Sequence, residues 1–281
     1  MAKKKPSFLK NWVESPSWFR AFLIGVALCA AAFLANIALS EVRPYNAWGL
    51  TYGTLAAVLM AIVALYGLRR RTTNVALKLR LGRAQPWLQF HLYAGALCLL
   101  LTLMHSGFHV PKGILTWWLW VLSIWVTASG LFGALLQRWI PTILASGLGN
   151  EVLYERIPDL ITEIKDKAKT LAETCADPVW DFYKKNLARA LEAPQPRLIY
   201  YVDVTGGIQG RMKQFDYLRR LLSPEERDKL NKLEALYKTK LEIDAHFTLQ
   251  RTLRGWLYLH VPVSLVLLVL VAFHIFTILY Y

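Results

Sequence analysis

The chain has 281 residues, of which 55% are hydrophobic and 19% charged, and its formal net charge is +14. Its mean hydropathy is positive, at +0.32, which excludes an ordinary soluble domain and predicts a membrane protein. The excess charge does not predict a nucleic-acid partner, because residues 138–254 hold 20 Lys and Arg against 17 Asp and Glu, a balance of only +3. The expected partner for the rest of the chain is membrane lipid.

Five segments are apolar and long enough to cross a hydrocarbon core, which takes about 20 helical residues. In chain order they are residues 21–40, 48–68, 87–110, 114–136 and 256–281. The first segment follows a group of lysines, but its apolar run is about twice that of a signal peptide, so we expect a retained anchor. The predicted fold is an all-α membrane protein, with four transmembrane helices in residues 1–140, an insertion at 141–250 and the fifth helix at 251–281.

The basic residues beside these spans predict the orientation. Five lie in residues 1–20 and six in residues 69–85, whereas the alternate connections carry only Arg43 and Lys112. Because positive charge is retained on the cytoplasmic side, we predict that the N-terminus, the 69–85 loop and the 138–254 insertion are cytoplasmic and that Tyr281 lies outside. A bacterial inner membrane suits this topology.

The insertion is expected to be mostly helical. Apolar residues recur near helical period from Leu153 to Leu171, and a second helix is expected to follow, capped by Asp177. Ser223 and Glu226 form a capping-box pattern, and we expect the helix that begins there to continue toward the fifth span. That pattern predicts one long helix entering the membrane.

One short strand is also expected in the insertion. Residues 198–204 are rich in β-branched and aromatic side chains, and the turn residues at 205–207 follow directly. A single strand cannot form a sheet, so this segment is predicted to be a minor feature of a helical region.

Four of the six histidines form two pairs with one spacing: His91 with His105 in the third span, and His260 with His274 in the fifth. Fourteen helical residues fall about 40° short of four full turns and cover about 21 Å, so both histidines of a pair lie on one helix face. Because the two spans run in the same direction, His91 should match His260 in depth and His105 should match His274. An imidazole inside hydrocarbon is costly unless its nitrogens are used, so the four need a shared explanation.

Haem iron supplies that explanation. Iron bound axially by two neutral histidines uses one nitrogen of each, and the other N–H can donate to a carbonyl or hydroxyl. We therefore predict two bis-histidine b haems, an inner one on His91 and His260 and an outer one on His105 and His274. They are expected to be non-covalent, because no C-x-x-C-H motif is present. For any one of these histidines alone, a hydrogen bond between helices is the simpler alternative.

Other residues carry weaker signals. Gly53 and Gly67 are also fourteen apart, so they are candidate haem-contacting notches, although glycine equally serves close helix packing. His109 lies one turn beyond His105 and has three readings: a quinone pocket, a propionate donor or a headgroup contact. His246 does not predict a third haem, because the depth-equivalent position in the third span is a leucine.

The ligand pattern His91-x13-His105 and His260-x13-His274, on two parallel spans separated by one other, resembles the di-haem cytochromes b. It is similar to the membrane domains of ferric reductases and NADPH oxidases, which also place their ligands on the third and fifth spans. Those families continue into a flavin and nicotinamide domain, whereas this sequence stops within its last helix. The resemblance to quinol-oxidising cytochromes b likewise implies one subunit of a redox complex.

Three functions follow as hypotheses. The leading one is an electron-transfer subunit of an oxidoreductase complex, with quinone or quinol at one end and a partner such as an iron–sulfur protein or cytochrome c at the other. The second is a transmembrane reductase of ferric ion or oxygen, supplied with electrons by a separate flavoprotein. The third is a haem-free membrane assembly or transport subunit, whose histidines bind metal or pack between helices. The sequence assigns no catalytic residue.

Overall fold

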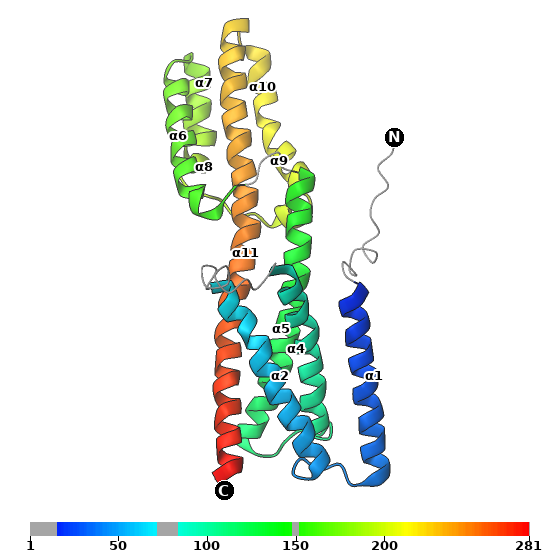
Figure 1. Cartoon of the computed structure of the whole chain (residues 1–281). Helices are drawn as coiled ribbons and strands as arrows, with labels where there is room; N and C mark the ends of the chain where they lie inside the picture. Colours follow the sequence, from blue (N-terminus) through cyan, green and yellow to red (C-terminus); the bar gives the residue numbers. More distant parts are fainter. Residues whose placement is uncertain (1–15, 72–83, 148–151, 281) are drawn as a thin grey trace. The chain divides into compact units, whose positions relative to one another are not determined.

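The computed structural model describes residues 16–71, 84–147 and 152–280, and within these ranges the chain is helical and has no strand (Figure 1). Five helices are long and apolar enough to cross a membrane. They are α1 (Pro16–Leu39), α2 (Ala47–Arg71), α4 (Ala84–His105), α5 (Ile114–Gly147) and α11 (Pro224–Tyr280). These helices confirm the predicted all-α class and the five apolar spans. The N-terminal residues and most of the 69–85 loop, on which the predicted orientation depends, lie outside the described residues.

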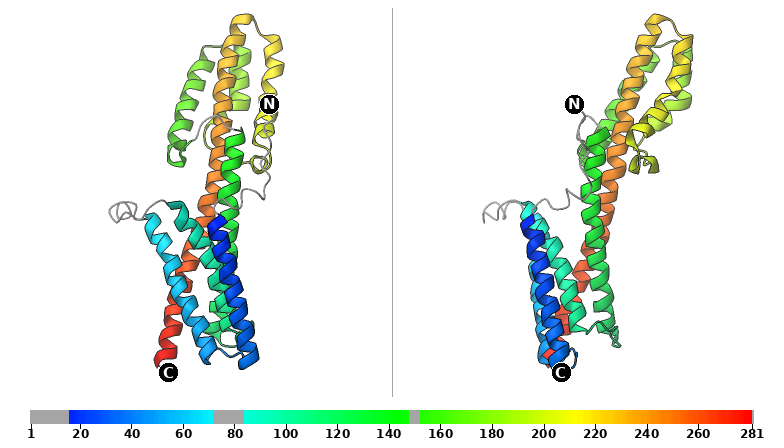
Figure 2. Two further views of the ribbon diagram at one scale, coloured as in Figure 1. Left: turned by 45° about the vertical axis from the view of Figure 1, so that its right-hand side comes forward. Right: turned by 90° about the vertical axis from the view of Figure 1, so that its right-hand side faces the viewer.

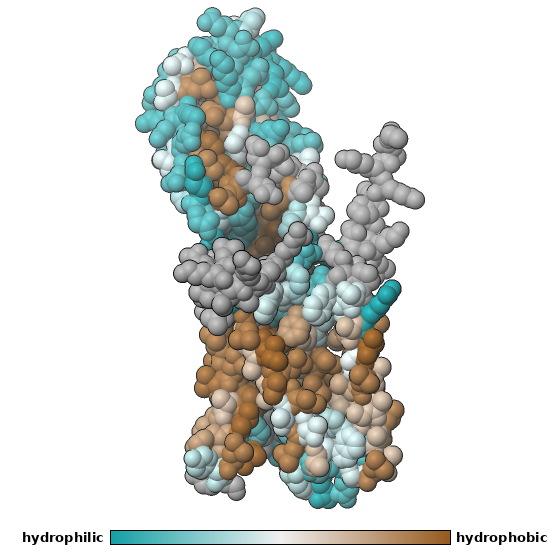
Figure 3. Space-filling model, in the orientation of Figure 1, coloured by the Kyte–Doolittle hydropathy of each residue, from teal (hydrophilic) through white to brown (hydrophobic). Residues whose placement is uncertain are grey.

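The chain divides into two compact units, 1–134 with 258–281, and 135–257. Unit 1 contains α1, α2, α4, the first part of α5 and the last part of α11. Within it, α4 packs against α2 and, less extensively, against α1 (Figures 1 and 2). On the face shown in Figure 3 these helices expose many apolar side chains, among them Leu23, Ile24 and Leu28 of α1. Helices can face lipid in this way because each satisfies its backbone hydrogen bonds internally.

A small core joins α2 to α4 in unit 1. Tyr52 and Ala56 of α2 are buried against Cys98, Leu101 and Met104 of α4. Small side chains at positions 56 and 98 let the two backbones approach closely, and the Cys98 thiol donates to the Ala56 carbonyl at 3.3 Å. This packing brings the carbonyls of α2 close to the histidines of α4.

The third apolar helix ends earlier than the sequence pattern predicted. It stops at His105 rather than at position 110, because Gly107 and Phe108 both adopt left-handed backbone angles, with φ of 63° and 60°. The chain then turns, and the Phe108 amide donates to the Leu103 carbonyl. A glycine in this conformation ends a helix without steric cost, and the apolar residues after it had concealed the boundary.

Unit 2 contains the last turns of α5, the first part of α11 and the shorter helices between them. Those are η1 (Tyr154–Arg156), α6 (Ile157–Glu173), α7 (Asp177–Phe182), η2 (Tyr183–Leu187), α8 (Ala188–Leu191), η3 (Leu198–Tyr201), α9 (Val204–Met212) and α10 (Gln214–Leu221). They bury a continuous apolar core against α11, and the predicted helix after Leu153 is present as η1 and α6. As predicted, α11 continues without a break from Pro224 to Tyr280 (Figure 2).

The predicted strand at 198–204 is wrong. Residues Leu198–Tyr201 form the 3₁₀ turn η3, and the predicted turn residues 205–207 lie inside α9. Strand propensity is decided by pairing, and the described part of the chain offers no strand to pair with. Instead, Asp203 caps α9 by accepting a hydrogen bond from the Gly206 amide at 2.8 Å.

The two predicted helix starts differ in outcome. The Ser223 hydroxyl accepts from the Glu226 amide at 3.5 Å, and α11 begins at Pro224, as the capping pattern indicated. Glu226 itself does not complete the box, because its carboxylate accepts from the Ala176 amide. The cap expected at Asp177 is wrong by one residue, since Ala176 occupies the cap position and Asp177 is the first helical residue.

Candidate haem-binding site

Two pairs of imidazole rings face each other between α4 and α11 inside unit 1. The ring centres of His91 and His260 are 6.4 Å apart, and those of His105 and His274 are 6.5 Å apart. In both pairs the ring planes are inclined by 74°. The structure thus brings together the four histidines singled out in the sequence, in the depth-matched combinations, and the two helices run parallel.

These distances fit an iron atom between the rings. A bond from imidazole nitrogen to a metal is about 2 Å long and the ring centre lies about 1 Å behind the nitrogen, so two axial rings on one iron have centres about 6 Å apart. A stacked or edge-packed histidine pair has no reason to repeat this spacing and angle fourteen residues along both helices. The geometry therefore suits a pair of axial ligands at each level.

The composition of the site also suits haem. A structural zinc site takes four protein ligands, whereas haem brings its own equatorial nitrogens and needs only axial ligands from the protein. Each histidine pair supplies the two ligands that a six-coordinate haem requires.

Main-chain carbonyls of α2 orient both histidines of α4. The His91 Nδ1–H donates to the Val63 carbonyl at 3.0 Å, and the His105 Nδ1–H donates to the Gly49 carbonyl at 2.8 Å. A carbonyl can only accept, so each ring carries its proton on Nδ1 and presents the lone pair of Nε2 for coordination. The two carbonyls are themselves fourteen residues apart, which repeats the histidine spacing on the antiparallel neighbour.

His260 is oriented by a hydroxyl on α5. The Ser129 Oγ lies 2.8 Å from His260 Nδ1, and the same hydroxyl donates to the Val126 carbonyl at 3.0 Å. Because the one hydroxyl proton points to Val126, the oxygen accepts from His260, which again leaves Nε2 for a metal. Gly130 adjoins this contact, since a Cβ there would lie 3.4 Å from His260 Cε1.

The two glycines predicted as haem notches have different surroundings. A Cβ added to Gly53 would lie 2.8 Å from His105 Nδ1, so this glycine makes room for the imidazole that reaches the Gly49 carbonyl one turn earlier. A Cβ added to Gly67 would meet no described protein atom within 4 Å. The haem-contact role of both remains a prediction, and the structure shows a protein contact only for Gly53.

Sequence reasoning missed Ser129 and Gly130. Their signal was present, because a serine and a glycine interrupt the apolar run of the fourth span. It was weak, since hydroxyls in membrane helices usually bond to their own backbone, as Ser123 does with the Leu119 carbonyl. The carbonyls of Gly49 and Val63 had no side-chain signal at all.

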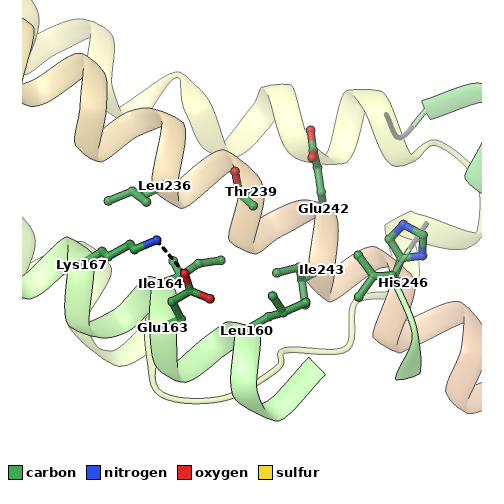
Figure 4. A pocket seen from close by; sticks show the side chains of 10 residues that line it. Leu160, Glu163, Ile164, Lys167, Leu236, Thr239, Glu242, Ile243 and His246 are labelled. Atoms are coloured by element: carbon green, nitrogen blue, oxygen red, sulfur yellow. Dashed lines mark hydrogen bonds and ion pairs between the residues drawn. The ribbon is translucent and has the colours of Figure 1, made fainter. Parts of the chain in front are cut away.

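The two remaining histidines, His109 and His246, are not members of these ring pairs. His109 follows the end of α4 in the turn after Gly107, outside the helix that carries His91 and His105. His246 lies on α11 in unit 2 and is 3% exposed. It lines a cavity of about 380 Å³ between α6 and α11 (Figure 4), where the Glu163 carboxylate accepts from Lys167.

In comparisons with known proteins, no protein-family model, curated protein or solved structure matched the chain.

Proposed function

We propose that this chain is a di-haem cytochrome b of a membrane, serving as an electron-transfer subunit of an oxidoreductase complex. The observation that carries the proposal is the repeated ring pair: two histidine pairs, 6.4 and 6.5 Å between centres, with one interplanar angle of 74°. Three of the four rings have Nδ1 in a hydrogen bond to a fixed oxygen, which is how proteins orient histidine ligands.

Haem in such a site supplies reversible one-electron chemistry. The residues of the chain do the rest. His91 with His260, and His105 with His274, would each hold one haem through both histidines, which would suit electron transfer better than the binding of oxygen or another substrate. On each helix the two histidines are fourteen residues apart, so the two facing ring pairs are separated by about 21 Å along the helix axis. This distance is comparable to most of the thickness of a hydrocarbon core.

The electron partners belong to the proposal. A quinone or quinol at one end and a redox protein, such as an iron–sulfur protein or cytochrome c, at the other would make the chain a conduit between the two faces of a bacterial inner membrane. In this arrangement the N-terminus and the 138–254 insertion are cytoplasmic, following the basic residues beside the spans.

The test is the haem content of protein purified in mild detergent. We expect a reduced-minus-oxidised spectrum of b type and two haems per chain by the pyridine-haemochrome assay. His105→Ala and His260→Ala should each lose one haem, from different levels. Matched controls are His109→Ala and His246→Ala, which remove histidines outside the paired rings and should keep both haems.

The opposite results would be equally clear. Protein without haem, or His105→Ala and His260→Ala variants that both retain two haems, would overturn the proposal and favour the assembly or transport hypothesis. Electron delivery to a quinone analogue by the intact protein would support the conduit. Reduction of ferric ion or oxygen without any quinone would favour the reductase instead.

A further inference from the structure

Unit 2 exposes a small group of apolar side chains that its own core does not use. Leu198 is 84% exposed, Val202 is 83% exposed and Ile199, between them, is 48% exposed. The intervening Tyr200 is fully buried, so the segment is held firmly while its apolar side chains point outward. We call Leu198, Ile199 and Val202 the apolar tip.

The segment that carries the apolar tip is bound to α11 at three successive turns. The Gln195 amide donates to Asp244 Oδ1 at 2.9 Å, and the Arg197 amide donates to Thr248 Oγ1 at 3.3 Å. The Tyr201 hydroxyl then bonds to Thr252 Oγ1. The partner residues on α11 advance by four positions each time, so the segment runs along α11 in the direction of its apolar C-terminal part.

Asp244 is itself held in place. It forms an ion pair with Lys240 at 2.7 Å, and both side chains are fully buried. Burial lowers the pKa of Lys240 and raises that of Asp244, while their mutual attraction opposes both shifts. The ion pair holds the Asp244 carboxylate in place, and this fixes the first contact of the segment, the one from the Gln195 amide.

Aromatic residues beside the last contact of the segment, between Tyr201 and Thr252, indicate that it lies at the edge of the apolar spans. Tyr201 stacks on Trp139 of α5, with ring centres 6.3 Å apart and planes inclined by 21°. Trp139 belongs to the stretch Ile114–Leu144, which is apolar enough to cross a membrane, and Thr252 lies one helical turn before Trp256 on α11. Tryptophan and tyrosine concentrate where a helix leaves the hydrocarbon and enters the headgroups.

Basic residues flank the same level. Arg138 directly precedes Trp139, and Arg251 directly precedes Thr252 and is exposed. Arginines at this depth favour lipid phosphates, and aromatic and aliphatic side chains beside them favour the acyl boundary. The apolar tip therefore continues a surface that already has the composition of a membrane interface.

We infer that the apolar tip inserts into the headgroup–acyl boundary of the bilayer at the face where α5 and α11 leave it. Leu198, Ile199 and Val202 are the inserting side chains, and the Tyr201 contacts with Thr252 and Trp139 set their depth. The tip thus anchors the polar unit to the membrane surface at a point outside its spanning helices. This anchor does not depend on haem.

The test uses the full chain with its three native cysteines replaced, reconstituted in nanodiscs of phosphatidylcholine and phosphatidylglycerol. The variant Val202→Cys then has a single cysteine, which carries an environment-sensitive nitrobenzoxadiazole label. The same labelled protein is also placed in nanodiscs whose lipids carry bromine on the acyl chains near the glycerol. The matched control is Leu221→Cys, which is 66% exposed and lies at the end of α10, just before α11 begins.

We expect the label at position 202 to show blue-shifted emission and to lose intensity in the brominated nanodiscs. The label at position 221 should show neither change. Both positions are exposed, so neither variant should disturb folding, and an unchanged melting temperature would verify this. The inference is overturned if the label at position 202 is as wet and as insensitive to bromine as the one at 221, which would leave the apolar tip to a soluble protein partner.

Discussion

Replacing Ser129 by alanine tests the local argument for the His91–His260 pair. The substitution removes the oxygen that lies 2.8 Å from His260 Nδ1 while leaving Nε2 and both helices unchanged. Loss of a hydrogen bond to a ligating histidine typically lowers metal affinity about 10- to 100-fold, equivalent to about 1.4 to 3 kcal/mol. A single neutral hydrogen bond contributes about 1 kcal/mol, so we expect the lower end of that range.

The reduction potential should respond as well. A hydrogen bond from Nδ1–H makes the imidazole donate electron density to iron more strongly, which favours the ferric state. Ser129→Ala should therefore raise the reduction potential of the haem proposed for His91 and His260. A tenfold change in the ferric-to-ferrous preference corresponds to about 59 mV for one electron, which sets the expected scale of the shift. The other proposed haem, held by His105 and His274, would serve as an internal reference.

The assay is a spectroscopic redox titration of the purified protein, together with its haem content. Ser264→Ala is the matched control, because the Ser264 hydroxyl donates to the main-chain carbonyl of His260 at 2.7 Å and not to the ring. The reasoning is refuted if Ser129→Ala leaves both potentials and occupancies unchanged, or if Ser264→Ala produces the same shift.

Three further predictions concern other positions. Gly53→Ala would place a Cβ 2.8 Å from His105 Nδ1, about 0.6 Å inside ordinary contact, at an overpacking cost of about 1 to 3 kcal/mol. We therefore expect the variant to lose the haem proposed for His105 and His274, as measured by the haemochrome assay. Retention of both haems would contradict this prediction. Lys240→Met leaves the Asp244 carboxylate buried without its cation and should destabilise unit 2 by about 3 to 5 kcal/mol. Thermal or denaturant unfolding measures this loss, and a change below about 1 kcal/mol would argue against a buried pair. Burial raises the pKa of Tyr200 to about 12, so the folded state keeps its proton between about pH 10 and 12 while the unfolded state loses it, and stability should fall there by up to about 3 kcal/mol. Tyr200→Phe should reduce this alkaline slope without lowering stability at pH 7, because the Tyr200 hydroxyl has no hydrogen-bond partner among the described residues.

The sequence by itself predicted the all-α fold with its five apolar helices and the register of its histidines. Apolar runs of membrane length and the need to satisfy backbone groups inside lipid leave helices as the only local solution, and five such helices are present. The fourteen-residue spacing then places His91 and His105 on one face, because the rise and turn of a helix are independent of its neighbours. The Ser223 cap and the uninterrupted helix after it are local features of the same kind.

The sequence did not correctly predict elements whose conformation depends on contacts with other parts of the chain. Residues 198–204 have the side chains of a strand, yet without a second strand they form η3 and lead into α9. The end of α4 at His105 depended on the backbone angle of Gly107, which the apolar residues beyond it obscured.

Only the tertiary structure decided what stands behind each imidazole. The acceptors for His91 and His105 are carbonyls of Val63 and Gly49, and a carbonyl is the same atom in every residue, so no sequence pattern could single them out. Gly53 and Gly67 look equivalent in the sequence, but only Gly53 faces a ring. That difference comes from how α2 is rotated against α4, which the packing of Tyr52 and Ala56 on Cys98 sets and the hydropathy of either helix does not.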